Sequence, residues 1–375
     1  MTNAIGDYLA RFIEDAAEED KPFFLYAAFT AGHWPLMAPE ETIAKYKGKY
    51  AGGWDALRAS RHAQQISLGI VQSEWGITPR GPRVPAWERA SYHEWEQRRT
   101  EVYAAQIDLL DQNIGKIVTK LRQLGILDNT LICFMSDNGG NYEEMSSIPA
   151  GQPRSPSIPY ETRYGLPVVP GNDPSIIPGP ATTYASYGIP WGNVSNTPFR
   201  LYKHFAHEGG VSTPFVVHWP RGIKQKGITH TIGHEIDVMP TCLEIAGIAY
   251  PATSKAGTPP PPLEGKSLVP VFDGRQIPDR TLCWEHEGNH AVREGKWKLV
   301  SRFPNSWELY DMERDRIEMH DLADQFPDRV KKIANDYSEW AKRVGTRPWP
   351  MPETPRVPER EGAMTAPAYL LKDRL

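Results

Sequence analysis

Continuous apolar runs that alternate with segments of helical periodicity constrain the fold of this chain most strongly. Residues 22–29 (PFFLYAAF), 130–136 (TLICFMS) and 213–220 (TPFVVHWP) are apolar without alternation, as in strands buried on both faces of a parallel sheet. Residues 5–17 and 103–124 repeat apolar side chains at spacings of three and four, which predicts helices. This alternation predicts an α/β fold class.

The C-terminal part of the sequence has a different character. A further helix is predicted at 236–247, after which short aromatic segments separated by turns predict a small antiparallel sheet. A charged amphipathic helix is expected at 325–344. We therefore expect a large α/β domain over residues 1–278, a small α+β subdomain over 279–345, and an extended or disordered tail over 346–375.

Charge and cysteine content exclude several classes of function. The 42 basic and 46 acidic residues give a formal net charge of −4, so neither nucleic acid nor an anionic membrane is an expected partner. Three widely spaced cysteines argue against a disulfide framework and a thiolate metal cluster. The acidic N-terminus has no signal-peptide pattern, which predicts a cytoplasmic chain as given; a periplasmic location stays open if the natural N-terminus lies upstream.

An acid and an amide follow the second apolar run directly. In the segment SDNGG, Asp137 and Asn138 supply a carboxylate and an amide carbonyl, which are oxygen ligands suited to Ca²⁺ or Mg²⁺. Gly139 and Gly140 let the backbone turn away from these side chains at once. A turn closed by an Asx hydrogen bond is the alternative interpretation, and the spacing alone favours it.

Two further side chains could take part in chemistry. His33 follows the first apolar run, and functional groups of α/β sheets gather at the carboxyl ends of strands. His33 could protonate a leaving group or bind an anion, or it could be a packed histidine beside Trp34. Lys203 precedes the third apolar run and could hold a tetrahedral oxyanion as a point charge, or it could be a solvated surface lysine.

Four blocks carry a resemblance to a known family. They are KPFFLYAAFTAGHWP, QNIGKIVTKLRQLGILDNTLICFMSDNGG, SNTPFRLYKHFAHEGGVSTPFVVHWP and WEHEGNHAVREGKWKLV. Together, and in the family's order, they resemble the type I sulfatases of the alkaline phosphatase superfamily, in particular the bacterial arylsulfatase branch. The resemblance implies an alkaline-phosphatase-like α/β/α sandwich, incomplete at its N-terminus, with a small C-terminal antiparallel sheet and helix.

The resemblance also implies roles for four residues. Asp137 and Asn138 match the second pair of metal ligands, normally around Ca²⁺, with Mg²⁺ as the alternative. His33 matches the histidine that contacts the sulfate and assists the leaving oxygen, and Lys203 matches the lysine that binds a sulfate oxygen. The implied activity is hydrolysis of a small sulfate ester, as in an arylsulfatase, to an alcohol or phenol and sulfate. The sequence gives no indication of oligomeric state.

The sequence departs from the family pattern in its first part. No C/S-x-P-x-R motif occurs, so the formylglycine nucleophile expected in the family is absent from this chain. The paired aspartates and the K-x-H element of the family are also absent. We therefore expect an N-terminally truncated sulfatase that is inactive in isolation, because one acid and one amide alone hold a hard dication weakly.

Two alternatives to a sulfatase stay open on the sequence. One is a phosphodiesterase or phosphonate hydrolase of the same superfamily, and the other is a non-catalytic remnant.

The proline-rich stretch 145–200 is expected to shape the entrance of the site, because long ordered loops at a strand edge usually serve binding. The aromatic residues expected to line it are Tyr160, Tyr164, Tyr184, Tyr187 and Trp191.

Overall fold

The computed structural model describes residues 1–19, 21–149 and 151–351. The tail expected over 346–375 therefore falls mostly outside the described residues. The helices are α1 (Thr2–Glu18), α2 (Glu40–Ile43), α3 (Gly53–Ser67), α4 (His93–Gln123), α5 (Gly188–Ser195), α6 (Glu208–Val211), α7 (Val238–Ala246), α8 (Val269–Phe272) and α9 (Pro327–Val344). The strands are β1 (Ile132–Met135), β2 (Val169–Pro170), β3 (Thr183–Tyr184), β4 (Phe215–His218), β5 (Thr281–His286), β6 (Asn289–Glu294), β7 (Trp297–Ser301) and β8 (Glu308–Asp311).

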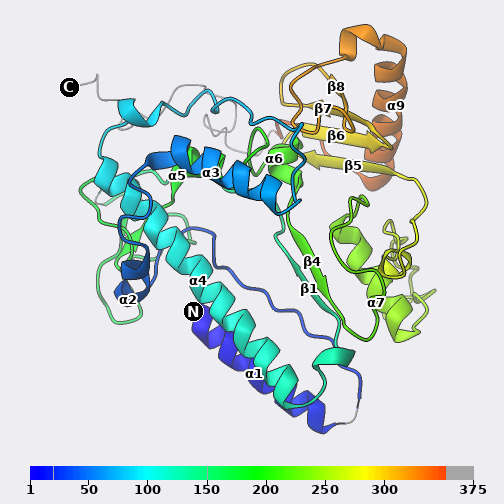
Figure 1. Cartoon of the computed structure of the whole chain (residues 1–375), viewed down its shortest axis with the longest axis horizontal. Coiled ribbons are helices and arrows are strands. Elements are labelled where there is room, and N and C mark those ends of the chain that lie inside the picture. Colours follow the sequence, from blue (N-terminus) through cyan, green and yellow to red (C-terminus); the bar gives the residue numbers. More distant parts are fainter. Residues whose placement is uncertain (20, 150, 352–375) are drawn as a thin grey trace.

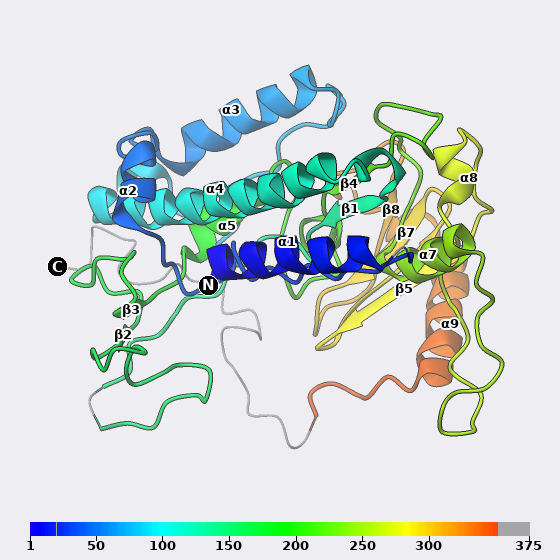
Figure 2. The same cartoon turned by 90° about the horizontal axis from the view of Figure 1, so that it is seen from below.

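Helices α1 and α4 lie side by side and run in the same direction, which is visible in both cartoon views (Figures 1 and 2). Their apolar faces meet, and Leu9 and Ile13 of α1 are buried there. Ion pairs of Asp7 with Lys116 and of Glu14 with Lys120 follow the same parallel alignment. Both helices are confirmed where the sequence predicts them, because each has one apolar face of helical period.

Helix α4 begins ten residues before the predicted start. Its first turns contain Glu96 and Arg99, whose side chains are fully buried and form an ion pair at 3.0 Å. Trp191 donates from Nε1 to the second Glu96 carboxylate oxygen, Oε2, at 3.0 Å. A buried charged pair gives no hydrophobic periodicity, so the apolar pattern could not reveal this part of the helix.

The predicted strand at 22–29 is wrong. These residues form no strand, and Phe24 and Tyr26 are 76% and 80% exposed. Strand β1 pairs antiparallel with β4, with Cys133 opposite Val217, instead of lying in a parallel sheet. The expected burial on both faces is also wrong, since Phe134 and Val216 are exposed. An apolar run predicts that a segment needs burial, but it does not specify which strand pairs with it.

The C-terminal sheet has the predicted antiparallel form. Strands β5, β6, β7 and β8 pair in chain order, and α9 packs against one face of the sheet (Figure 1). Val292, Leu299, Leu309 and Ile333 are fully buried between the strands and the helix. These elements confirm the small antiparallel sheet and helix, while the domain boundary at 278/279 stays a prediction.

A cluster of tryptophans forms the core between α3, α4 and α5. Trp54 contacts Trp87 edge to face at 4.6 Å and Trp191 at 5.7 Å between ring centroids. Trp191 and Tyr187 belong to this core and also border the large open cavity, whereas Tyr160 and Tyr164 are exposed; the expected role of these aromatic residues at an entrance stays a prediction. In the described part of the chain, no helix combines the length and apolar character that a bilayer span requires.

Candidate functional site

Lys203 and His33, which are 170 positions apart, are in direct contact. The ammonium Nζ of Lys203 lies 3.0 Å from His33 Nε2. On the other side of the ring, His33 Nδ1 lies 2.9 Å from the carbonyl oxygen of Trp34. A carbonyl oxygen can only accept, so Nδ1 carries the proton and Nε2 accepts from the ammonium. The imidazole therefore presents one defined atom, Nε2, beside a fixed cation.

Backbone contacts hold Lys203 against the loop that follows β1. Its backbone N–H donates to the Gly140 carbonyl oxygen at 3.1 Å. The buried amide of Asn196 joins the same two segments: its Oδ1 accepts from Gly140 N at 2.7 Å, and its Nδ2 donates to the Leu201 carbonyl at 3.0 Å. The lysine is thus positioned by hydrogen bonds of the main chain, and this leaves its side chain to reach His33.

Asp137 and Asn138 follow the end of β1. The two glycines after them, Gly139 and Gly140, lie at the point where the chain packs against Gly209 and Gly210. Gly139 N donates to the Gly210 carbonyl at 2.9 Å, and a Cβ on Gly139 would lie 1.8 Å from the Gly209 carbonyl oxygen. Only glycine allows this approach. Asn138 donates from Nδ2 to the Gly139 carbonyl at 3.0 Å, a bond that does not use its amide oxygen.

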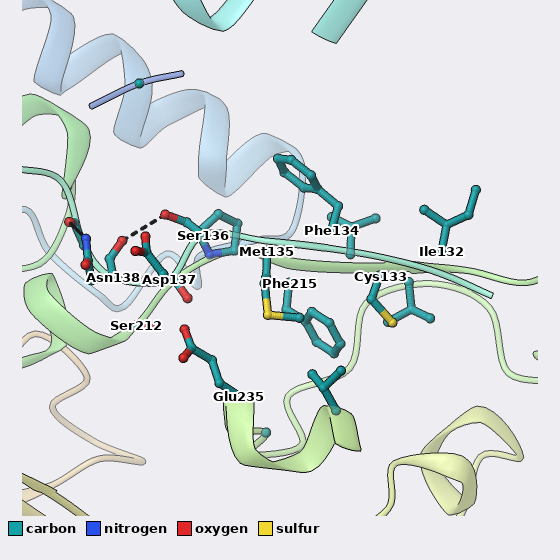
Figure 3. Close-up of a pocket in the computed structure, with 18 of the residues that line it drawn as sticks. Ile132, Cys133, Phe134, Met135, Ser136, Asp137, Asn138, Ser212, Phe215 and Glu235 are labelled. Carbon is teal, nitrogen blue, oxygen red and sulfur yellow. Dashed lines mark hydrogen bonds between the residues drawn. The ribbon is translucent and has the colours of Figure 1, made fainter. Parts of the chain in front are cut away.

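The residues around Asp137 fit a hard cation by the chemistry of their donors. Figure 3 shows the Glu235 carboxylate pointing toward the Asp137 carboxylate from η4 (Glu235–Asp237). Burial, together with the negative charge of Asp137, raises the pKa of Glu235 above its usual value. Two facing carboxylates and an amide oxygen make an all-oxygen set, which suits Ca²⁺ or Mg²⁺. Sequence reasoning missed Glu235, because an acid just before a helix is typical of an ordinary helix start.

The four predicted site residues border one open cavity, which Asp137, Asn138, Lys203 and His33 all line. His33 and Lys203 touch directly, and the backbone bond of Lys203 to Gly140 ties them to the loop that carries Asp137 and Asn138. Side chains from three separate parts of the sequence thus border the same cavity, and those of His33 and Lys203 are in direct contact. Their chemical roles stay predictions.

A partly buried acid next to this group, Glu143, was not found from the sequence. The Glu143 carboxylate accepts from Trp34 Nε1 at 2.7 Å and Asn141 Nδ2 at 2.9 Å, and His204 Nε2 lies 3.2 Å away. Burial opposes the charge of Glu143, but these bonds and the positive charge of Lys203 hold its pKa well below the usual range. These contacts favour the charged form of Glu143 near Lys203. Nothing in the local sequence NYEE distinguishes it from a surface acid.

Glu208, five residues after Lys203, links this region to the C-terminal sheet. Its carboxylate pairs with Lys298 of β7 at 2.7 Å and with Arg316. Lys298 also pairs with buried Glu318 at 2.8 Å. The network therefore holds two cations, Lys298 and Arg316, and two anions, Glu208 and Glu318, so its charges are compensated internally. Glu208 therefore has a structural role, whereas Lys203, five residues earlier in the chain, makes the contact with His33.

Comparisons with known proteins give a consistent result. Residues 1–248 match the family model described as sulfatase, and residues 199–342 match a model described as the C-terminal part of N-sulphoglucosamine sulphohydrolase. A sulfatase of Schizosaccharomyces pombe is 33% identical over 338 residues, which cover 88% of this chain and 59% of the relative. An arylsulfatase of Klebsiella aerogenes is 34% identical over 265 residues, 68% of this chain and 53% of the relative.

The fold has a solved counterpart. The crystal structure of Ps i-CgsB aligns with a TM-score of 0.57 at 21% identity, covering 91% of this chain and 55% of that chain. This likeness confirms the predicted fold class. The chain spans a little more than half the length of the curated relatives it matches.

Proposed function

This chain belongs to the sulfatase family, and we propose that it supplies the sulfate-binding and metal-binding side chains of a sulfuric ester hydrolase. The contact between Lys203 Nζ and His33 Nε2 carries the proposal. The ammonium can donate to one oxygen of a tetrahedral ester group, and the imidazole nitrogen 3.0 Å away can donate to a second oxygen once Nε2 has taken up a proton. The substrate class that follows is a small sulfate ester.

Lys203 would act on the negative charge of the ester. Its ammonium can hydrogen-bond a sulfate oxygen and neutralise charge that grows on it in the transition state. Because His33 Nδ1 already donates to the Trp34 carbonyl, Nε2 is the ring atom that can exchange a proton with the leaving oxygen. Glu143 keeps Trp34 in place through the Trp34 Nε1 bond and so helps orient His33.

The sulfatase family uses a bound metal ion, and we propose Ca²⁺ here, with Mg²⁺ as the alternative. Asp137 and Asn138 would hold it, and the direction of the Glu235 carboxylate supports a third oxygen ligand (Figure 3). When bound, such an ion polarises the ester oxygens as a Lewis acid. The family also uses a formylglycine nucleophile, but the printed sequence has no C/S-x-P-x-R motif. We therefore expect no turnover by this chain alone.

An assay of 4-nitrophenyl sulfate tests the proposal. It should be run on the chain alone and on the chain joined to the polypeptide encoded immediately upstream, each with Ca²⁺ and then with a chelator. We expect calcium-dependent release of 4-nitrophenol only in the joined form. Turnover of a phosphodiester without any sulfate ester turnover, or a folded protein that is inactive in both forms, would contradict the proposal.

A further inference from the structure

A second group of side chains lies beside the proposed sulfate site. We call it the histidine cluster, and it consists of His204, His286 and Glu287, with Glu143 behind His204. His204 follows Lys203 in the chain, whereas His286 ends β5 and Glu287 lies in the β5–β6 turn. The three potential ligand atoms of His204, His286 and Glu287 all lie within 4.8 Å of one another. The cluster thus joins the Lys203 loop to the C-terminal sheet.

The histidine nitrogens face each other closely. His204 Nδ1 lies 2.6 Å from His286 Nε2, and the ring centroids are 4.8 Å apart with an angle of 25° between the ring planes. Glu287 Oε2 lies 3.8 Å from the same His204 Nδ1. Two ring nitrogens and a carboxylate oxygen therefore converge on one small volume, which is the donor set of a three-ligand zinc site with an open fourth position.

The group behind His204 fixes the tautomer that such a site needs. Glu143 Oε1 lies 3.2 Å from His204 Nε2, and a carboxylate only accepts, so Nε2 carries the proton and the Nδ1 lone pair faces His286 and Glu287. Trp34 and Asn141 hold Glu143 itself. A carboxylate on the far nitrogen is the arrangement that orients histidine ligands of metal ions and increases their basicity.

The backbone is also unusual at two of the three donors. His204 has φ +80° and Glu287 has φ +53°, both in the left-handed region. Glu287 and Gly288 form the two-residue turn between β5 and β6, where Asn or Asp before Gly would be the favoured choice. A glutamate costs free energy at this position, but its longer side chain reaches His204. Such costs are retained mainly at functional positions.

From this geometry we propose that His204, His286 and Glu287 bind a divalent cation of the zinc class, with Glu143 as a positioning residue. Two carboxylates beside two neutral imidazoles give the net negative charge that a dication requires. The mixed nitrogen and oxygen donors differ from the all-oxygen set around Asp137, so the two positions select different ions. Tetrahedral bonds of about 2.0–2.1 Å place two ligand nitrogens roughly 3.3 Å apart. The two rings must therefore move apart slightly when the ion binds.

Metal binding tests the proposal without any enzyme activity, so its failure would not bear on the sulfatase proposal. The purified protein is stripped with a chelator and titrated with Zn²⁺ by calorimetry, and with Co²⁺ by visible absorption. We expect one tight Zn²⁺ per chain and the absorption of low-coordinate Co²⁺. His286→Ala and the conservative Glu287→Gln should each weaken Zn²⁺ binding by more than tenfold, and Glu143→Gln by about 10-fold to 100-fold.

The exposed His320 provides the matched control. His320→Ala removes a histidine of the same subdomain and should leave Zn²⁺ affinity and the Co²⁺ spectrum unchanged. Equal Zn²⁺ affinity in wild type, His286→Ala and Glu287→Gln would overturn the proposal, and the cluster would then be a hydrogen-bond relay only. An unchanged affinity in Glu143→Gln would overturn the positioning role of Glu143.

Discussion

At the scale of single residues, the candidate site depends on where Lys203 and the glycines of the β1 loop are held. The lysine contacts His33 Nε2, and its backbone bonds to Gly140. The loop itself crosses the Gly209–Gly210 pair at a distance that excludes any side chain on Gly139. Substitution of Lys203 therefore tests the chemical role of its charge. Substitution of Gly139 by alanine tests the backbone packing of the loop.

Lys203→Ala should reduce kcat for 4-nitrophenyl sulfate by about 10²-fold to 10³-fold in the active form of the protein, because one charge-stabilising donor is lost. Lys203→Arg should recover only part of the rate, since a planar guanidinium does not replace a compact ammonium. Steady-state kinetics measure both. The exposed Lys224 pairs with Asp273 away from the site, and Lys224→Ala should keep the wild-type rate. Equal rates in the Lys203 and Lys224 variants would rule out the proposed role.

Gly139→Ala should destabilise the protein by more than about 2 kcal/mol, because the new Cβ would overlap the Gly209 carbonyl oxygen and force the two backbones apart. Urea unfolding measures the change. Gly115→Ala is the matched control: this glycine lies inside α4 with nothing within 4 Å of an added Cβ, so the change should stabilise the protein by about 0.5–1 kcal/mol. Similar unfolding midpoints for the two variants would show that the loop can relax.

At the scale of elements, buried polar networks determine how the C-terminal sheet attaches. Glu308 of β8 accepts from Tyr310 at 2.6 Å and lies 3.3 Å from both His207 Nε2 and Arg200 Nη2. Burial opposes its charge, yet the bonds from His207 and Tyr310 and the charge of Arg200 outweigh it and lower the pKa of Glu308 from 4.5 to about 2. The segment from Arg200 to His207 is thereby fixed to β8.

This shift predicts a pH-dependent contribution to stability. Because the pKa of Glu308 is lower in the folded than in the unfolded protein, the contribution of its charge to the free energy of unfolding is complete above pH 4.5. This contribution is lost as the pH falls through about 2. At pH 7, Glu308→Gln should lower the free energy of unfolding by roughly 2 kcal/mol, since bonds to a charged group are replaced by weaker ones. Urea unfolding at pH 7, 4 and 3 should show this difference shrinking in acid. A constant difference across the three pH values would contradict the assignment.

The sequence predicted the elements whose packing is local. Helices α1, α4, α7 and α9 and strands β1 and β4 lie close to their expected positions, because apolar periodicity reports directly on a buried face. The prediction from apolar periodicity failed at residues 22–29, because a strand forms only with a partner strand. It also failed at the start of α4, because the buried side chains there are an ion pair. For the site, the family resemblance indicated His33, Lys203, Asp137 and Asn138, whose roles stay predictions. Glu143 and Glu235 were missed, because their environment comes only from tertiary contacts.

At the scale of the whole molecule, one large apolar surface stands out. Residues 22–29, strands β1 and β4 and helix α7 border the same open cavity and expose apolar side chains toward it. Two strands with an exposed apolar face are a template for further pairing. Contiguous apolar surface of this kind marks an interaction face, and in an isolated chain it promotes association.

Val216 of β4 lies on this surface and is 57% exposed. Val216→Lys should reduce self-association of the isolated chain at micromolar concentration, because a charge on an exposed strand opposes strand pairing. Light scattering after size exclusion measures the effect. Val344→Lys, at the end of α9 and 44% exposed, is the control and should associate like wild type. A monodisperse wild-type chain would show that the apolar surface is not adhesive.

The central claim is that His33, Lys203, Asp137 and Asn138 surround one sulfate ester. The most direct measurement is a crystal structure of the active protein with Ca²⁺ and a slowly hydrolysed sulfate ester. We expect the cation on the oxygens of Asp137 and Asn138, and ester oxygens within hydrogen-bond distance of Lys203 Nζ and His33 Nε2. A sulfate group bound elsewhere, with these four side chains unoccupied, would contradict the account.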